Sequence, residues 1–470
     1  MYKTELDEYI ETHREEMLRD IMELIRIDSV KSEPKPGMPF GEKNARVLQK
    51  AEKLLASYGF QTRNYDNYVI TADLAEGERK LDLLAHLDVV PAGNDWSVTE
   101  PFSPVIQDGK LYGRGSADDK GPALAAVYAM RAVRELKLPL SGNVRLILGS
   151  DEESGSDDIA YYYQKEKAAP MTLSPDAQFP LVNIEKGILH GQFQGTYEET
   201  EKKGARVEEL QAGTGINVVP GQAQAVLGGI SEEKLEMLCA QAEEQTGIRF
   251  TTEKEGNRIR LTVHGNSCHA SLPDTGNNAL TGLLTVLTEP VFQECGMYSK
   301  LQALHTCFPH GDFSGQALGA AMSDELSGAV EISLTQLNCK DGQVTGGFDS
   351  RTPLCATNEN FRDVIRRRME ADGLHLGDRG IYAPHHVPED TPFVQKLLDC
   401  CEMYEGKREK PLVIGGGSYV HAIPGGVAFG CADPRVDNHM HGKDEFAEIE
   451  QLVKSAKIYA QAIVRLCGKE

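Results

Sequence analysis

The first half of the chain contains no cysteine. All ten cysteines lie at or after Cys239, and none of them forms a Cys-x-x-Cys pair. A chain of 470 residues can bury a large core without disulfides, so this distribution indicates reduced thiols. Cys400 and Cys401 are adjacent and Cys268 precedes His269. Cysteines at these positions can serve in metal binding or redox chemistry. The alternative is that they are small buried apolar side chains, which is the ordinary role of a free cysteine.

The chain also lacks any apolar run long enough to cross a bilayer, and its N-terminus, MYKTELDEYIETHREEML, is charged throughout, unlike a signal peptide. Basic residues are few: 49 Lys and Arg stand against 71 Asp and Glu, a formal net charge of -22. A field of that sign repels phosphate backbones and anionic lipid surfaces. We therefore expect a cytoplasmic protein that has no nucleic-acid or membrane partner.

Short apolar runs alternate with helical patterns in the first part of the chain. Strand-like runs cover 68–74, 81–90 and 144–150, and an Ala-rich segment predicts a helix over 121–136. Apolar side chains at helical spacing predict one amphipathic opening helix over 5–27. This alternation predicts an α/β fold with a mixed, mostly parallel sheet flanked by helices.

The pattern changes after Gly187, where charged segments punctuated by glycine begin. The alternation of helices and strands resumes after residue 383. At this length two domains are expected. We predict a discontinuous first domain, 1–187 and 384–470, interrupted by an inserted α+β domain over 188–383.

Polar side chains suited to divalent metals lie where strands of the first domain end. His86 and Asp88 follow one strand, and Glu152 and Glu153 follow another. Ligands gather at the carboxyl ends of strands in α/β sheets. Residues two apart on a strand share a face, so Asp88 can accept a hydrogen bond from the His86 imidazole and fix its tautomer. Taken alone, the pair also fits a surface histidine beside a turn aspartate.

Further acids crowd tight turns. Asp118 and Asp119 are adjacent in GRGSADDKG, and Asp176 lies between prolines in SPDAQFP. Clustered carboxylates repel one another unless cations lie between them, which favours a metal centre. The alternative is a set of solvated acids that cap helices, and for Asp119 we expect this capping role.

Six segments carry a resemblance that extends over almost the whole chain: LLAHLDVVPAG, LYGRGSADDKG, GSDEESG, SPDAQFPLVNIEKG, GNSCHASLPDTGNNAL and NHMHGKDEF. Together they resemble the dinuclear metallopeptidase family of aminoacylases, deacylases and carnosinase-type dipeptidases. The chain is most similar to the bacterial dipeptidase V branch, the Xaa-His dipeptidases. The resemblance implies that the discontinuous domain is catalytic and that the insertion is a lid, built as a doubled ferredoxin-like domain.

The resemblance implies a centre of two divalent metal ions, zinc or manganese, with cobalt also possible. The resemblance implies that Asp118 bridges the two ions. It implies that His86 and Asp176 bind one ion and that Glu153 and His441 bind the other. His439 is a rival ligand, but the spacing from His441 to Glu445 matches the family's last motif. A cis peptide between Asp118 and Asp119 is also implied.

The resemblance further implies catalytic roles. Glu152 is the general base that accepts a proton from a water bridging the two ions and delivers it to the leaving amine. Asp88 is the partner of the histidine ligand. His269, in the insertion, stabilises the oxyanion.

Substrate-binding roles are implied for the insertion and for a glycine-rich segment. Asn217 matches the residue that holds the substrate's carbonyl group, and Arg351 offers a planar fork suited to its carboxylate. The segment IGGGSYVHAIPGG can bind the same carboxylate through backbone N–H groups, at Gly416, Gly417 and Ser418. It lacks the Lys-Ser/Thr ending of a phosphate loop, which argues against a nucleotide site.

Three functions are open at this stage. The first is a metal-dependent dipeptidase acting on unblocked dipeptides, and the second is an N-acyl-amino-acid deacylase, which shares the whole metal site. The third is a catalytically silent metal-binding protein, but a binding module has no need of Glu152. A doubled lid within one chain predicts a monomer.

Overall fold

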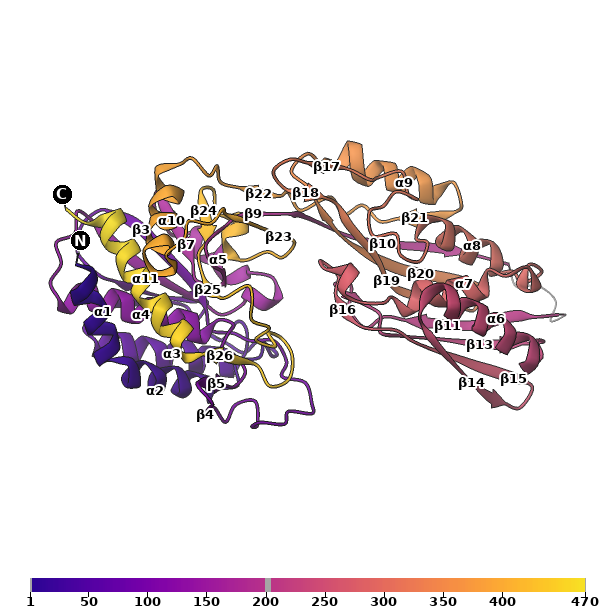
Figure 1. The fold of residues 1–470 in the computed structure, drawn as a ribbon, viewed down its shortest axis with the longest axis horizontal. Helices are drawn as coiled ribbons and strands as arrows, with labels where there is room; N and C mark the ends of the chain where they lie inside the picture. Colours follow the sequence, from indigo (N-terminus) through magenta and orange to yellow (C-terminus); the bar gives the residue numbers. More distant parts are fainter. Residues whose placement is uncertain (1, 199–203, 470) are drawn as a thin grey trace. The chain divides into compact units, whose positions relative to one another are not determined.

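The computed structural model describes residues 2–198 and 204–469, which form two compact units (Figure 1). The first unit comprises Met1–Ile184 and His386–Glu470, and the second comprises Glu185–His385. Each unit has its own buried apolar core. The chain therefore leaves the first unit once and returns to it once.

The first unit is built on a nine-stranded sheet with the order β1-β2-β6-β3-β7-β24-β9-β22, in which β23 also pairs with β9. Its strands are β1 (Gln61–Tyr65), β2 (Val69–Asp73), β3 (Arg79–His86), β6 (Asn143–Gly149), β7 (Met171–Ser174), β9 (Val182–Glu185), β22 (His385–His386), β23 (Leu412–Ile414) and β24 (Gly426–Ala428). The neighbours β6, β3, β7 and β24 run parallel, whereas β1–β2, β2–β6 and β24–β9 are antiparallel. The prediction of a mixed sheet is confirmed.

Helices cover this sheet. They are α1 (Lys3–Thr12), α2 (Arg14–Ile25), α3 (Glu42–Ser57), α4 (Lys120–Glu135), α5 (Asp157–Tyr163), α10 (Pro392–Glu405) and α11 (Ile449–Cys467). The Ala-rich α4 is buried along almost its whole length and packs against α11 and α2. Small side chains allow this close approach, and the buried α4 fixes the loop that precedes it.

The opening segment forms two helices, and the prediction of one helix over 5–27 is wrong. The backbone of His13 leaves the helical region, with φ -99° and ψ 8°. Its ring stacks on Tyr9 with centroids 4.0 Å apart, and Nδ1 lies 2.8 Å from the Tyr9 carbonyl oxygen. The apolar spacing survives the break, because Ile10 and Met17 on either side of it are both buried.

The second unit contains an eight-stranded antiparallel sheet with the order β14-β15-β13-β11-β19-β20-β10-β21. Its strands are β10 (Gly187–Thr196), β11 (Arg206–Ala212), β13 (Gln222–Gly228), β14 (Arg249–Glu255), β15 (Arg258–His264), β19 (Glu331–Lys340), β20 (Gln343–Thr352) and β21 (Leu374–Leu376). The helices are α6 (Glu232–Thr246), α7 (Ala279–Leu287), α8 (Tyr298–Cys307) and α9 (Asp363–Glu370). Burial alternates along β10, so one face of the sheet is packed and the other is open.

Short elements complete the two units. They are β4 (Val105–Gln107), β5 (Lys110–Tyr112), β8 (Ala177–Gln178), β12 (Val218–Val219), β16 (Cys268–His269), β17 (Ser323–Asp324), β18 (Gly328–Ala329), β25 (Cys431–Ala432), β26 (Phe446–Glu448), the single turns Glu152–Ser154, Pro273–Thr275, Pro290–Phe292 and Tyr419–Ala422, and a π-helical turn at Asn358–Arg362. No helix within residues 2–198 and 204–469 is long and apolar enough to span a bilayer. All ten cysteines, each in the described part of the chain, are unpaired, and all but Cys268 and Cys355 are buried.

Strand β6 ends at Gly149, where neighbouring side chains already fill the space that a Cβ would take. A Cβ on Gly149 would overlap the hydroxyl of Tyr419 and the carboxylate of Asp158. These two side chains are hydrogen-bonded, and the Asp158 carboxylate also accepts the backbone N–H groups of Ser150 and Asp151. The missing side chain lets the end of the strand pass beneath the segment that carries Tyr419.

We predict that Gly149→Ala lowers the free energy of unfolding by about 1–3 kcal/mol, because the added methyl must displace Tyr419 or Asp158. Thermal unfolding measures the change. Gly416→Ala in the same unit is the matched control, since its added Cβ meets nothing nearer than Ile414 at 3.9 Å. Equal melting temperatures for the two variants would contradict the prediction.

Candidate metal centre

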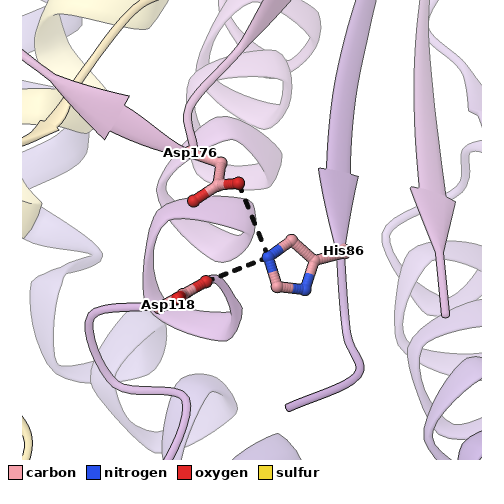
Figure 2. Close-up of side chains that lie close together, drawn as sticks. All are labelled: His86, Asp118 and Asp176. Atoms are coloured by element: carbon pink, nitrogen blue, oxygen red, sulfur yellow. Dashed lines mark ion pairs between the residues drawn. The ribbon is translucent and has the colours of Figure 1, made fainter. Parts of the chain in front are cut away.

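One histidine and two aspartates converge at the carboxyl end of β3 (Figure 2). Nε2 of His86 lies 2.9 Å from Oδ1 of Asp118 and 3.6 Å from Oδ2 of Asp176. Nδ1 of His86 lies 3.1 Å from the backbone carbonyl oxygen of Asp88 and 3.4 Å from its carboxylate. A carbonyl oxygen only accepts, so Nδ1 carries a proton, and Nε2 is the ring atom that would ligate a cation held between it and the acids.

A second cluster shares Asp118. Nε2 of His441 lies 2.8 Å from Oδ2 of Asp118 and 3.2 Å from Oε1 of Glu153. The two oxygens of Asp118 thus face different clusters, and within each cluster the ligand atoms lie within 4.8 Å of one another. His439 instead packs its ring against Phe446, with centroids 5.7 Å apart. The structure therefore brings together all five residues predicted as ligands.

Asp119 does not cap α4 with its side chain, and this expectation is wrong. The residue stands at the N-cap position, but its carboxylate makes no capping hydrogen bond. Oδ2 instead accepts the backbone N–H of His86 at 3.0 Å. The peptide between Asp118 and Asp119 is cis, as expected from the resemblance. The buried carboxylate thus holds the last residue of β3 beside the loop that carries Asp118.

Glu152 and Glu153 follow β6, as predicted, but they do not continue it as extended residues. Both lie in the short turn Glu152–Ser154. Their backbone N–H groups donate to the two carboxylate oxygens of Asp88, at 3.2 and 3.1 Å. Asp88 therefore fixes this turn as well as the ring of His86.

The cluster is electrostatically strained without cations. Burial raises the pKa of Glu152 well above its usual range, and the nearby carboxylates add to the rise. Burial and the charge of Asp118 raise the pKa of Glu153 to about 7. Burial alone would lower the pKa of His441, but the carboxylates of Asp118 and Glu153 outweigh it and raise the value to about 11. Positive charge is favoured at each of these positions.

The donor atoms fit a divalent metal. Among the residues described, His86 Nε2 and Asp118 Oδ1 are buried without a hydrogen-bond partner, and such atoms call for an explanation. Two imidazoles and three carboxylates, with no thiolate, form a donor set that accepts zinc, manganese or cobalt. The two histidines differ in access: the His86 side chain is 0% exposed and that of His441 is 48% exposed.

Asn217 and His269 lie together within the second unit. The short strands β12 and β16 pair Val218 with His269, and the Ala270 N–H donates to the Asn217 carbonyl oxygen at 2.9 Å. The backbone N–H of Ser271 lies 3.2 Å from Nδ1 of His269, and the Ser271 hydroxyl lies 2.7 Å from it. Because a backbone N–H only donates, Nδ1 is the acceptor, and the neutral ring carries its proton on Nε2.

Arg351 lies on β20 of the second unit and is held by a residue that the sequence did not single out. Its Nε and Nη2 each donate to the carboxylate of Asp349 at 2.8 Å, and His190 Nε2 lies 3.0 Å from the same carboxylate. Residues two apart on a strand share a face, so the spacing in FDSRT offered this signal.

Gly416, Gly417 and Ser418 lie in the first unit, between β23 and the turn that begins at Tyr419. The bond from Tyr419 to Asp158 anchors this segment. Tyr419 lies in the glycine-rich segment, but its partner Asp158 is 261 residues away in the sequence, so no spacing signal joined the two.

The model of peptidase family M20/M25/M40 matches residues 83–465. The chain belongs to this family. The resemblance drawn from the six segments is thereby confirmed.

The M20 chain is 35% identical to the putative dipeptidase YtjP of Bacillus subtilis over 96% of its own length and 97% of that protein. It is 31% identical to the Beta-Ala-Xaa dipeptidase of Lactobacillus delbrueckii, with 98% of both chains covered. The crystal structure of human carnosine dipeptidase 1 is similar in fold, with a TM-score of 0.63 at 17% identity, and 99% of each chain is covered.

We predict that zinc or manganese raises the melting temperature of the metal-free M20 protein, because ions that bind only the folded state stabilise it by about 2.7 kcal/mol at 100 times Kd. Asp176→Asn removes one ligand and should reduce the shift. Asp82→Asn is the control, because Asp82 is buried on β3, the strand that ends at His86, and pairs with Arg79 rather than with the centre. No shift with zinc, manganese or cobalt would refute the centre.

Proposed function

We propose that this M20 protein is a metal-dependent dipeptidase that hydrolyses dipeptides with a free amino group and a free carboxylate. The observation that carries the proposal is the pair of ligand clusters sharing Asp118, with the partly buried acid Glu152 beside them. Whole-length similarity to two proteins named as dipeptidases supports the substrate class.

In this proposal, His86 and Asp176 would hold one ion, Glu153 and His441 would hold the other, and Asp118 would contribute to both. The ions are zinc or manganese, with cobalt as a further candidate. When bound, such ions polarise the scissile carbonyl and make a nearby water more acidic. Asp88 keeps the Nε2 lone pair of His86 directed at its ion.

Glu152 is the group that moves the proton. Its backbone N–H donates to Asp88, which fixes the turn that carries this carboxylate beside the two ligand clusters. It takes the proton of the attacking water and transfers it to the leaving amine, which must depart protonated.

The second unit supplies groups that recognise the substrate. The Nε2–H of His269 is the donor proposed for the oxyanion, and Asn217 lies beside it. Arg351 binds the terminal carboxylate, with Asp349 fixing the plane of its guanidinium. Backbone N–H groups of 416–418 are the proposed second contact to that carboxylate. Because one chain forms the whole eight-stranded sheet, we expect a monomer to be active.

We predict that the protein with added manganese or zinc cleaves Leu-Leu but neither N-acetyl-Leu-Leu nor N-acetyl-leucine. Glu152→Gln should lower kcat by about 10²–10⁴, because the glutamine side chain cannot take up the proton of the attacking water. Amino-acid release measured by chromatography reports the activity. Glu166→Gln is the control, since this partly buried glutamate binds Tyr65 away from the clusters. Release from N-acetyl-leucine would indicate a deacylase, and no turnover of any substrate would indicate a silent binder.

We predict that Arg351→Lys raises KM for Leu-Leu by about ten- to a hundred-fold, because lysine keeps the charge but loses the two-pronged bond to carboxylate. The KM for Leu-Leu amide should change little, so the preference for the free carboxylate should collapse. Arg362→Lys is the matched control, because Arg362 also forms a two-bond pair with an aspartate in the same unit. An unchanged ratio of the two KM values would exclude this role.

A further inference from the structure

Two loops that carry proposed metal ligands run side by side, because they extend a pair of strands. The end of β5 lies opposite the start of β26 in an antiparallel pair. The N–H of Gly113 donates to the carbonyl oxygen of Glu445 at 3.0 Å and extends this ladder by one step. The loop after β5 leads to Asp118, and the loop before β26 contains His441.

The carboxylate of Glu445 accepts several hydrogen bonds from the loop that follows β5. Oε1 accepts the backbone N–H groups of Gly115, Ala117 and Asp118, at 3.0, 3.0 and 3.3 Å. Oε2 accepts a hydrogen bond from Nη1 of Arg114. The Glu445 side chain is completely buried, so these bonds do not compete with water. Four donors on one carboxylate leave the turn before Asp118 little freedom.

The guanidinium of Arg114 holds the second loop. Its Nη2 donates to the carbonyl oxygens of His441 and Gly442, at 3.1 and 3.0 Å. The guanidinium is buried and lies 5.5 Å from the ring centroid of Trp96. Arg114 and Glu445 therefore bond, as one unit, to the backbone of two ligand residues that lie far apart in the sequence.

We propose that the Arg114–Glu445 pair positions Asp118 and His441 relative to each other, and so controls how tightly the ion between Asp118, Glu153 and His441 is held. The pair touches neither the ion nor the substrate. The inference rests on the proposed two-ion centre and names the residues that set the affinity of one half of it.

The opposite half is held by other groups. Asp119 accepts the N–H of His86, and Asp88 accepts from the ring of the same residue. No hydrogen bond in the described part of the chain joins Arg114 or Glu445 to His86 or Asp176. The pair bonds to the backbone of two ligands of the His441 half but of only one ligand, the shared Asp118, of the other half, so its loss should weaken the His441 half more.

A role in fold stability alone does not account for this arrangement. A buried ion pair is weak evidence for stability, because well-packed apolar residues of similar volume often serve as well or better. Apolar residues could not bond the N–H of Asp118 or the carbonyl of His441. Outer partners that orient ligands change metal affinity by about 10- to 100-fold when they are mutated.

The test is a zinc titration of the metal-free full-length protein in competition with a chromophoric chelator, which yields two dissociation constants. Trp96 is the only tryptophan in the chain, so its emission follows the Arg114 loop in the same titration. His441→Ala identifies which constant belongs to the His441 half. Glu445→Gln keeps the size and acceptor oxygen of the side chain but removes its charge.

Glu445→Gln should weaken the constant assigned to the His441 half by about 10- to 100-fold and change the other less than about threefold. Arg114→Lys keeps the charge and loses the fork to the His441 loop, so it should weaken the same constant. Asp82→Asn, another buried carboxylate paired with arginine in this unit, should leave both constants at the wild-type values.

The inference is overturned if both substitutions leave the two constants unchanged, or weaken the two constants equally. If circular dichroism shows that Glu445→Gln does not fold, Arg114→Lys alone tests the inference. Two unchanged constants, or two equally weakened ones, would again overturn it. A wild-type protein that binds fewer than two ions would contradict the proposed two-ion centre itself. Two bound ions, with the same dissociation constants in the variants as in the wild type, would contradict only the positioning role.

Discussion

The repulsion among buried carboxylates is the constraint on which the first unit depends. Asp118, Glu152, Glu153 and Asp176 converge where strands of the sheet end, and burial raises the pKa of all of them except Asp118. Asp118 differs because it lies between two histidines. Such a cluster persists only where the backbone is held firmly and positive charge is supplied. The fold meets the first condition with its own hydrogen bonds, and divalent ions fit the second.

A second set of acids provides that firm hold. Asp88 accepts the N–H groups of the Glu152–Ser154 turn, Asp119 accepts the N–H of His86, and Glu445 accepts those of the Asp118 loop. Carboxylates are strong acceptors for backbone N–H groups, and a buried one that is fully bonded fixes several residues at once. The acids at this site therefore form two groups. One group faces the proposed metal centre, and the other accepts backbone N–H groups and fixes the loops around it.

Local pattern predicted much of this fold, and the failures have physical causes. The strands at 69–73, 79–86 and 143–149 and helix α4 lie close to their predicted ranges, because short apolar runs between turn residues favour strands and an alanine-rich run favours a helix. The helix break at His13 was not predicted, because the spacing of apolar side chains continues through it. The five clustered residues were found through motifs, whereas Asp158 and Arg114 act through contacts between residues far apart in the sequence, which spacing does not encode. Boundaries at 187 and 383, the doubled ferredoxin-like form and the roles of the site residues stay predictions.

The unequal exposure of the two histidines has a consequence for how the protein would acquire its metals. His86 is sealed within the first unit, whereas almost half of the His441 side chain meets solvent. His441 is the only one of the five proposed ligands with a largely exposed side chain, so we expect an ion bound through it to leave sooner than one bound through His86. Under a changing metal supply the two positions would then be filled at different rates, and one molecule would hold two different metals.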